Sequence, residues 1–325
     1  MIFVINLSLT RESFVMLDED SAALVRGFRS LDIPRTETLS PLQARAAMAV
    51  ERGARPSLPV PMVEVRDLAL GTQKNHIAGR LYRPNAERDL PLLVFFHGGG
   101  WVLGDLESHD ILCRRLAAAG KTNVLAVDYR LAPENKFPSA IEDAVAAVDW
   151  AFARADELQV NVERIMVGGD SAGGNLAAVV AHERRNNNKP RLECQILIYP
   201  ATDLACASPS YKIAEEGLPV LGTTMIWFRD HYLAEPFQME DWRASPLRAP
   251  DFANLPPAYV LTVGYDPLSD EGKTYARKLV DGGVSVVHRH YPGQIHGFLS
   301  MGPELPTAES AIAELGAYMR GRSDQ

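Results

Sequence analysis

The motif Gly169-Asp170-Ser171-Ala172-Gly173 stands directly after a short apolar run at 165–167 and directly before a helical pattern at 172–185. A serine at the tip of a tight strand-to-helix turn needs glycine on both sides, because a side chain at either position would collide with neighbouring backbone. The helix that follows offers free N–H groups near a developing negative charge. The motif therefore predicts a strained turn that presents the Ser171 hydroxyl above a sheet, as a nucleophile.

Strand-like and helix-like patterns alternate along the rest of the chain. Strands are predicted at 63–70, 77–82, 92–96, 123–127, 165–167, 194–199, 258–263 and 284–290, and helices at 108–119, 138–152, 172–185, 274–280 and 308–320. The continuous apolar run at 92–96 is typical of a strand that is buried on both faces. This order predicts an α/β fold with a central, mostly parallel sheet and helices on both faces.

Two segments interrupt the alternation, and we predict that they form a helical cap over the sheet. Residues 1–55 carry amphipathic stripes and predict one or two helices. Residues 203–245 form a long insertion, with a helix rich in bulky apolar side chains at 223–234. Long insertions at loop ends usually build lids or binding surfaces. The core is then divided into 56–202 and 246–325.

A glycine-rich loop, His97-Gly98-Gly99-Gly100-Trp101, follows a predicted buried strand. Glycine lets the backbone approach a ligand closely, and a loop of this type supplies half of the oxyanion hole in lipases and esterases. We therefore expect the backbone N–H groups of Gly98, Gly99 and Ala172 to hold the oxyanion of a tetrahedral intermediate. The His97 ring is expected to be structural and to bond the backbone of its own loop.

The serine needs a base and an acid, which follow it along the chain in the order acid, then histidine, in sites of this kind. His296 is the predicted base, because it comes after the last strand, whereas His288 and His290 lie within the strand pattern and predict solvated or packed side chains. Two carboxylates are candidates, since Asp266 and Asp203 each follow a predicted strand. Asp266 is favoured, with Asp203 as its rival, and the acid would orient the imidazole and stabilise it when protonated.

Composition excludes several other classes of protein. The 325 residues contain 33 Lys plus Arg against 41 Asp plus Glu, and the net charge of −8 disfavours nucleic-acid binding. The three cysteines lack metal-ligand spacing and indicate reduced thiols, and the apolar run at 1–7 is too short to span a membrane. No second histidine follows His182-Glu183 at the spacing of a zinc protease, and no phosphate-binding glycine motif follows a strand. We therefore expect a cytoplasmic enzyme with no cofactor and no metal.

Together, the motifs resemble those of the hormone-sensitive-lipase family of α/β-hydrolases, the bacterial family IV esterases. The resemblance begins near residue 60 and includes five motifs in order: the loop at 97–101 with Gly104, Asp128-Tyr129-Arg130-Leu131-Ala132-Pro133-Glu134, the serine turn, Asp266-Pro267-Leu268, and His296-Gly297-Phe298. It implies an α/β-hydrolase fold with a cap, a serine carboxylesterase and a triad of Ser171, Asp266 and His296. It also supports Asp266 over Asp203.

The resemblance further implies short- to medium-chain acyl esters as substrates, with Trp101, Tyr199 and Phe298 as pocket walls. It is compatible with a homodimer formed through the late strand near His288 and the final helix. Two other functions share these residues: an amidase or deacetylase of small aryl amides with the same triad, and a small-molecule receptor without turnover. Loss of the triad histidine would mark the receptor, and His296 is present.

Overall fold

The structure is a computed structural model that describes residues 16–30, 34–54, 59–71, 77–185, 189–213 and 217–321. The apolar run at 1–7, predicted to be too short for a membrane span, lies outside these residues. None of the helices in the described ranges is both long enough and apolar enough to cross a bilayer.

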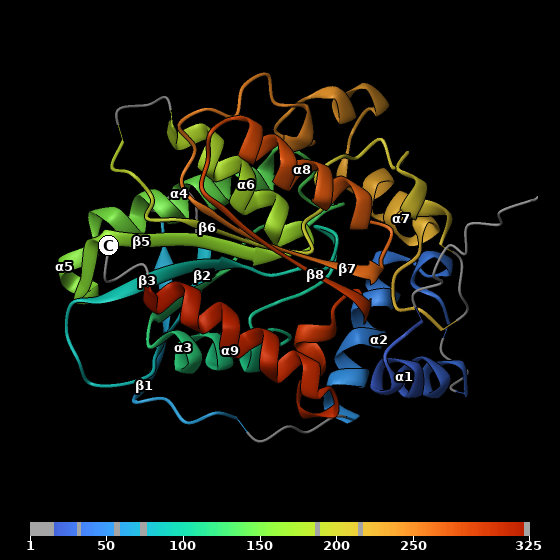
Figure 1. Ribbon diagram of the computed structural model, residues 1–325, viewed down its shortest axis with the longest axis horizontal. Coiled ribbons are helices and arrows are strands. Elements are labelled where there is room, and N and C mark those ends of the chain that lie inside the picture. The colour runs from blue at the N-terminus through green and yellow to red at the C-terminus, as the bar shows by residue number, and fades with distance from the viewer. Residues whose placement is uncertain are drawn as a thin grey trace, which may run out of the picture.

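An eight-stranded sheet forms the centre of the fold (Figure 1). Its strands are β1 (Glu64–Leu70), β2 (Ile77–Arg83), β3 (Leu90–Phe96), β4 (Asn123–Asp128), β5 (Val160–Asp170), β6 (Gln195–Ile198), β7 (Ala258–Tyr265) and β8 (Val286–Ile295). They lie in the order β1-β2-β4-β3-β5-β6-β7-β8. Strand β2 pairs antiparallel with β1 and β4, and the other pairs are parallel. The predicted mostly parallel sheet is confirmed.

Helices cover both faces of this sheet, as the alternating pattern predicts (Figure 1). One face carries α3 (Asp110–Gly120) and α9 (Pro306–Gly321), and the other carries α4 (Ser139–Ala153), α6 (Ala172–Arg185) and α8 (Ser269–Asp281), with the short α5 (Ala155–Leu158) before β5. All seven residues of β3 are buried. Because side chains alternate across a strand, Val94 and Phe96 enter the core under α4 and α6, whereas Leu93 and Phe95 enter the core under α3 and α9.

Two element boundaries differ from the predictions in ways that affect the functional site. Strand β8 continues to Ile295, five residues beyond its predicted end, because it resumes pairing with β7 after an irregularity, with Ile295 opposite Tyr265. This extension places His296 at the very end of a strand rather than in a longer loop. Helix α8 begins at Ser269 instead of 274, with Asp270 in its first turn, where negative charge suits the helix dipole.

Three helices, which we call the cap helices, lie together at one end of the sheet (Figure 1). They are α1 (Glu19–Ser30), α2 (Pro41–Ala54) and α7 (Gly222–Tyr232). Short 3-10 turns accompany them at Thr36–Thr38, Pro209–Lys212, Pro236–Glu240 and Pro246–Arg248, and another follows β8 at Phe298–Glu304. The helices predicted in 1–55 and at 223–234 are therefore present.

Each of two N-terminal cap helices is bonded to a different segment of the sheet's end. The chain at α1 is tied to β8, since Ser21 Oγ donates to Gln294 Oε1 at 2.9 Å and Gln294 Nε2 donates to Asp18 Oδ2 at 2.7 Å. Helix α2 is tied to the glycine loop, where Arg45 Nε donates to the Val102 carbonyl at 2.8 Å. The cap helices are thus anchored on the two segments that flank the predicted base and the predicted oxyanion hole.

Candidate active site

The turn around Ser171 joins β5 directly to α6 and has the strained geometry that its motif predicts. Ser171 has a φ of +56°, in the left-handed region that side chains disfavour. A Cβ on Gly169 would lie 2.4 Å from the Phe96 carbonyl oxygen, and a Cβ on Gly173 would lie 1.9 Å from the same oxygen. Glycine is therefore required on both sides, and the close fit holds the serine at the tip of the turn.

The structure brings Ser171, His296 and Asp266 together from three separate segments. The His296 Nε2 atom lies 3.0 Å from Ser171 Oγ, and its Nδ1 atom lies 2.8 Å from Asp266 Oδ2. Asp266 directly follows β7, and its other oxygen, Oδ1, accepts the Leu268 N–H at 2.8 Å. The carboxylate is thereby fixed, and the hydroxyl, imidazole and carboxylate form a chain along which the serine proton can pass to Nε2.

The other candidate acid and the other late histidines lie outside this chain. Asp203 Oδ1 accepts the Arg248 Nε–H at 2.9 Å, so its carboxylate is engaged elsewhere. His288 Nε2 and His290 Nδ1 both bond the Thr262 hydroxyl, at 2.9 and 3.0 Å. Across the described ranges, no cluster of three or more His, Cys, Asp or Glu side chains is placed to hold a metal ion.

Burial and charge together set the basicity of the imidazole. His296 and Ser171 are each 6% exposed and Asp266 is fully buried. Burial by itself lowers the pKa of His296, but the adjacent Asp266 carboxylate and, to a smaller extent, Asp170 raise it, and the net pKa lies above its ordinary value. The imidazole is therefore a stronger base than a free histidine, which favours proton transfer from the serine.

The glycine loop corrects one member of the predicted donor set. The Gly98 N–H donates to Asp170 Oδ1 at 2.9 Å, with His109 Nε2 3.2 Å away, so it is not free to bind an oxyanion. The N–H groups of Gly99 and Gly100, whose φ angles are +113° and +60°, have no acceptor within the described part of the chain. The free N–H groups in the run are therefore those of its second and third glycines, not those of its first and second.

Ala172, the third predicted donor, is the first residue of α6. Its N–H therefore has no acceptor within the helix.

The sequence did not reveal the contacts that Asp170 and His109 make with Gly98. Asp170 is the variable position of the serine motif, and His109 lies within a predicted helix at 108–119. No spacing rule relates either of them to Gly98.

His97 has the structural position that the sequence predicts. Its Nδ1 atom lies 2.8 Å from the Gly98 carbonyl oxygen, and its ring stacks on Tyr129 with the centroids 4.4 Å apart. Burial, followed by the neighbouring His109, lowers the pKa of His97 to about 4, so the ring is neutral at pH 7. A neutral imidazole whose Nδ1 carries the proton donates to the loop backbone, as expected.

The three expected pocket walls occupy different positions. The Tyr199 ring lies against His296, with the centroids 4.7 Å apart, and Phe298 lies 6.3 Å from Tyr199. All three side chains are fully buried, and Trp101 is stacked on Tyr232 of α7 with the centroids 4.5 Å apart. Trp101 therefore joins the glycine loop to a cap helix.

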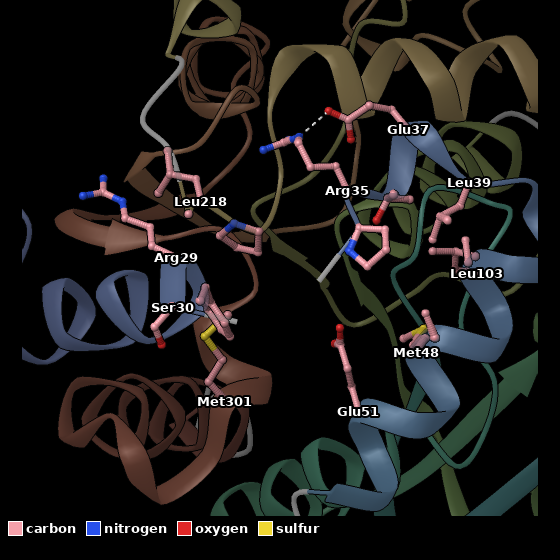
Figure 2. Close-up of a pocket in the computed structure, with 17 residues that line it drawn as sticks. Arg29, Ser30, Arg35, Glu37, Leu39, Met48, Glu51, Leu103, Leu218 and Met301 are labelled. Carbon is pink, nitrogen blue, oxygen red and sulfur yellow. Dashed lines mark hydrogen bonds and ion pairs between the residues drawn. The ribbon is translucent and has the colours of Figure 1, made fainter. Parts of the chain in front are cut away.

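A cavity of about 610 Å³ opens between α1, α2 and residues 217–219 (Figure 2). Its apolar walls are Phe28, Leu39, Met48, Leu103, Leu218 and Met301. Arg35 and Glu37, paired at 2.7 Å, also line it together with Arg29 and Glu51, whereas Trp101, Tyr199 and Phe298 do not (Figure 2).

Two of these walls touch the segments that carry the site. The Leu103 carbonyl oxygen would lie 2.3 Å from a Cβ on Gly99, and the Met301 methyl group would lie 3.8 Å from a Cβ on Gly297, next to His296. Leu103 and Met301 thus place the cavity wall next to the segments of Gly99 and His296, whereas Ser171, His296 and the glycine loop do not line it.

The chain matches known proteins over most of its length. The Abhydrolase_3 family model, described as an alpha/beta hydrolase fold, matches residues 93–300. The carboxylic ester hydrolase LipN of Mycobacterium tuberculosis is 41% identical over 264 residues, which is 79% of this chain and 70% of LipN. The ethyl acetate hydrolase of Pseudomonas putida is 39% identical over 257 residues, which is 76% of this chain and 80% of that enzyme.

Solved structures agree with these relatives. The ester hydrolase EH1AB1 from the metagenome of Lake Arreo, in complex with a bipyridine phosphonate derivative, has a TM-score of 0.91 and 38% identity and covers 95% of this chain and 100% of its own. The hyperthermophilic esterase of the archaeon Pyrobaculum calidifontis has a TM-score of 0.89 and 36% identity and covers 96% of this chain and 100% of its own. The chain belongs to this α/β-hydrolase family and is a carboxylic ester hydrolase of the serine hydrolase type.

Proposed function

We propose that the protein hydrolyses short- to medium-chain acyl esters through an acyl-enzyme on Ser171, with His296 as general base and Asp266 as the group that orients it. His296 Nε2 takes the proton of the Ser171 hydroxyl, whose oxygen attacks the acyl carbon and forms the new C–O bond. The alcohol leaves with that proton. A water molecule, deprotonated by the same imidazole, then releases the acid and restores the serine. The reaction consumes only ester and water.

The hydrogen-bonded chain from Ser171 through His296 to Asp266 carries this proposal. Its two contacts, at 3.0 and 2.8 Å, have the lengths needed for proton transfer and for fixing the tautomer. The strained turn supports it as well, because it holds the hydroxyl beside the base.

The oxyanion of the tetrahedral intermediate would be held by the N–H groups of Gly99, Gly100 and Ala172. The first two have no acceptor among the described residues, and the third is an orphan donor at a helix N-terminus. Removal of one such donor typically costs about 3 kcal/mol of transition-state stabilisation. Three donors therefore supply a large part of the rate enhancement that a serine hydrolase needs.

The cavity between α1 and α2 supports the choice of substrate class. Its walls Leu103 and Met301 lie next to the glycine loop and to the turn after His296, and we infer that it takes one arm of the ester. Apolar side chains, among them Leu39, Met48 and Leu218, form much of its wall, which favours a hydrocarbon arm, while Arg29, Glu51 and the Arg35–Glu37 pair also line it. Its walls come from 1–55 and from 203–245, together with the core, and we propose that these two segments act as one cap that limits the length of the arm.

The test is hydrolysis of p-nitrophenyl esters from acetate to palmitate by the wild type, with acetanilide as an amide substrate. We expect activity to be highest on the short and medium esters, to fall on the longest ones and to be absent on the amide. Activity that peaks at palmitate would contradict the proposed chain length. Activity on acetanilide that matches the ester activity would replace the esterase with the amidase.

We also propose a cytoplasmic location and a homodimer. No disulfide joins Cys113, Cys194 or Cys206, which suits a reducing compartment. Strand β8 is an edge strand, and edge strands can pair with another chain, so β8 and the adjacent α9 are the proposed contact. Fractionation of the native cells and light scattering of the purified protein test the two proposals. Recovery outside the cytoplasm would contradict the first, and a monomer at micromolar concentration would contradict the second.

A further inference from the structure

The carboxylate of Asp170, next to the nucleophile, is buried and serves the glycine loop. Asp170 is 5% exposed, and its Oδ1 atom accepts the Gly98 N–H at 2.9 Å. The same oxygen lies 3.2 Å from His109 Nε2. An unprotonated nitrogen at this distance would repel the carboxylate, so we assign the proton to Nε2, which donates to Asp170. Two donors from two different segments thus meet on one carboxylate oxygen.

The peptide between His97 and Gly98 is held at both of its polar ends. The Tyr129 hydroxyl donates to the His97 carbonyl oxygen at 2.8 Å, and the Gly98 N–H donates to Asp170. A Cβ on Gly98 would lie 2.5 Å from Asp170 Oδ2, so the carboxylate packs directly against the loop. This peptide plane therefore has little freedom to rotate.

The next peptide is held at its carbonyl end alone, and this leaves its N–H available. His97 Nδ1 donates to the Gly98 carbonyl oxygen at 2.8 Å. In a planar trans peptide the C=O and N–H point in opposite directions, so this bond turns the Gly99 N–H away from His97. The direction of the Gly99 N–H is thus set by two successive clamped peptides, and the first of them depends on Asp170.

We propose that Asp170, supported by His109, is a positioning residue that fixes Gly98 and thereby aims the Gly99 N–H at the oxyanion. The inference rests on the proposed function, because it assumes that Gly99 is an oxyanion donor. It assigns Asp170 no contact with the substrate. Its contribution is to remove the need for the loop to reorganise when charge develops, which is how a preorganised hole lowers the barrier.

Because Asp170 is charged, variants can separate the effect of its hydrogen bond to the loop from the effect of its negative charge. Burial alone raises the pKa of Asp170, but His109 and the other nearby histidines lower it by more than burial raises it. The net pKa lies below its ordinary value, so the side chain is a carboxylate at neutral pH. Asp170→Asn keeps an oxygen that can accept from Gly98 and His109, while it removes the charge and replaces the second oxygen by an NH2 group. Asp170→Ala removes the acceptor, and the double variant Asp170→Ala/His109→Ala also removes the imidazole nitrogen that could replace it.

The experiment measures kcat and KM on p-nitrophenyl butyrate, together with inhibition by a trifluoromethyl ketone, whose serine adduct carries an oxyanion. For Asp170→Ala and the double variant we expect kcat to fall about tenfold or more while KM changes less than about threefold. The inhibition constant should rise by the same factor as the loss in kcat/KM. Asp170→Asn should recover most of the loss, and His109→Ala should show the same pattern at smaller size.

The matched control is Asp143→Asn, a carboxylate as deeply buried as Asp170 but bonded to Arg130 on the α4 side of the sheet. It should lower the melting temperature without changing kcat or the inhibition constant. The proposal is overturned by a folded Asp170→Ala that keeps kcat within about threefold of the wild type, by inhibition that does not follow kcat/KM, or by Asp170→Asn losing as much as Asp170→Ala.

If Asp170→Ala does not fold, the His109→Ala enzyme decides the outcome, and unchanged kcat and inhibition there would equally overturn the proposal. Failure of the proposed function is distinguishable from all of these results. It would appear as a wild type whose activity survives Ser171→Ala.

Discussion

Replacement of Asp266 by asparagine would change only one atom of the site and would reverse the tautomer of its base. Asp266 is fully buried, with Oδ2 against His296 Nδ1–H and Oδ1 against the Leu268 N–H. An asparagine nitrogen at the Oδ2 position would donate to Nδ1 and force the proton onto Nε2, opposite Ser171 Oγ. The flipped amide would instead place its NH2 against the Leu268 N–H, so two donors would face each other.

The size of this effect follows from the loss of the base. An imidazole that is protonated at Nε2 cannot accept the serine proton, and the same replacement in a triad of this kind lowers kcat about 10⁴-fold. At about 1.36 kcal/mol for each tenfold change, this is about 5 kcal/mol of barrier. The loss should appear in kcat rather than in KM, because no wall of the cavity changes.

The assay is steady-state hydrolysis of p-nitrophenyl butyrate, with Asp203→Asn as the matched control. Asp203 also follows a strand, but its carboxylate is bonded to Arg248, so its replacement should leave kcat unchanged. A folded Asp266→Asn enzyme within tenfold of the wild type would refute the assignment of the acid. So would an Asp203→Asn enzyme that loses as much activity as Asp266→Asn.

Three further predictions follow from the geometry of the site. Activity requires the unprotonated imidazole, and because the net pKa of His296 lies above its ordinary value, kcat/KM should fall as the pH drops, with a midpoint above pH 6.5; a midpoint near pH 5 in a pH–rate profile would contradict the direction of the shift. Gly173→Ala would place a Cβ 1.9 Å from the Phe96 carbonyl, so urea unfolding should show a loss of more than about 3 kcal/mol, whereas a loss below about 1 kcal/mol would show that the turn can relax. Met48→Trp should fill part of the 610 Å³ cavity and lower turnover of p-nitrophenyl octanoate at least about tenfold relative to the acetate; an unchanged ratio would remove this cavity from the substrate path.

The fold could be predicted from the sequence because its strongest signals are local. The strand Leu90–Phe96 carries a continuous apolar run, and the helix Ala172–Arg185 follows the serine motif directly, so each is marked within its own stretch of sequence. The helix of the insertion was visible for the same reason. The end of β8 was not, because its last residues pair with β7 beyond an irregularity, and such pairing is a tertiary effect that no local pattern records.

The candidate site likewise contains residues that local motifs predict and residues whose roles depend on distant contacts. Ser171, Asp266 and His296 stand in motifs whose order along the chain is diagnostic. The distinction between Gly98 and Gly100 as oxyanion donor was not accessible, since three consecutive glycines have the same sequence signal. The two glycines differ because the Gly98 N–H donates to Asp170 Oδ1, and this hydrogen bond joins residues that are 72 positions apart. The position of Trp101 was likewise decided by a distant partner, Tyr232 of the insertion.

The central claim is a covalent acyl-enzyme on Ser171, and intact-protein mass spectrometry during turnover tests it most directly. The wild type, mixed rapidly with excess p-nitrophenyl butyrate and quenched in acid, should carry one butyryl group on the peptide that contains Ser171. Ser171→Ala should carry none and should lack activity. A butyryl group on another residue, or undiminished turnover by Ser171→Ala, would contradict the account.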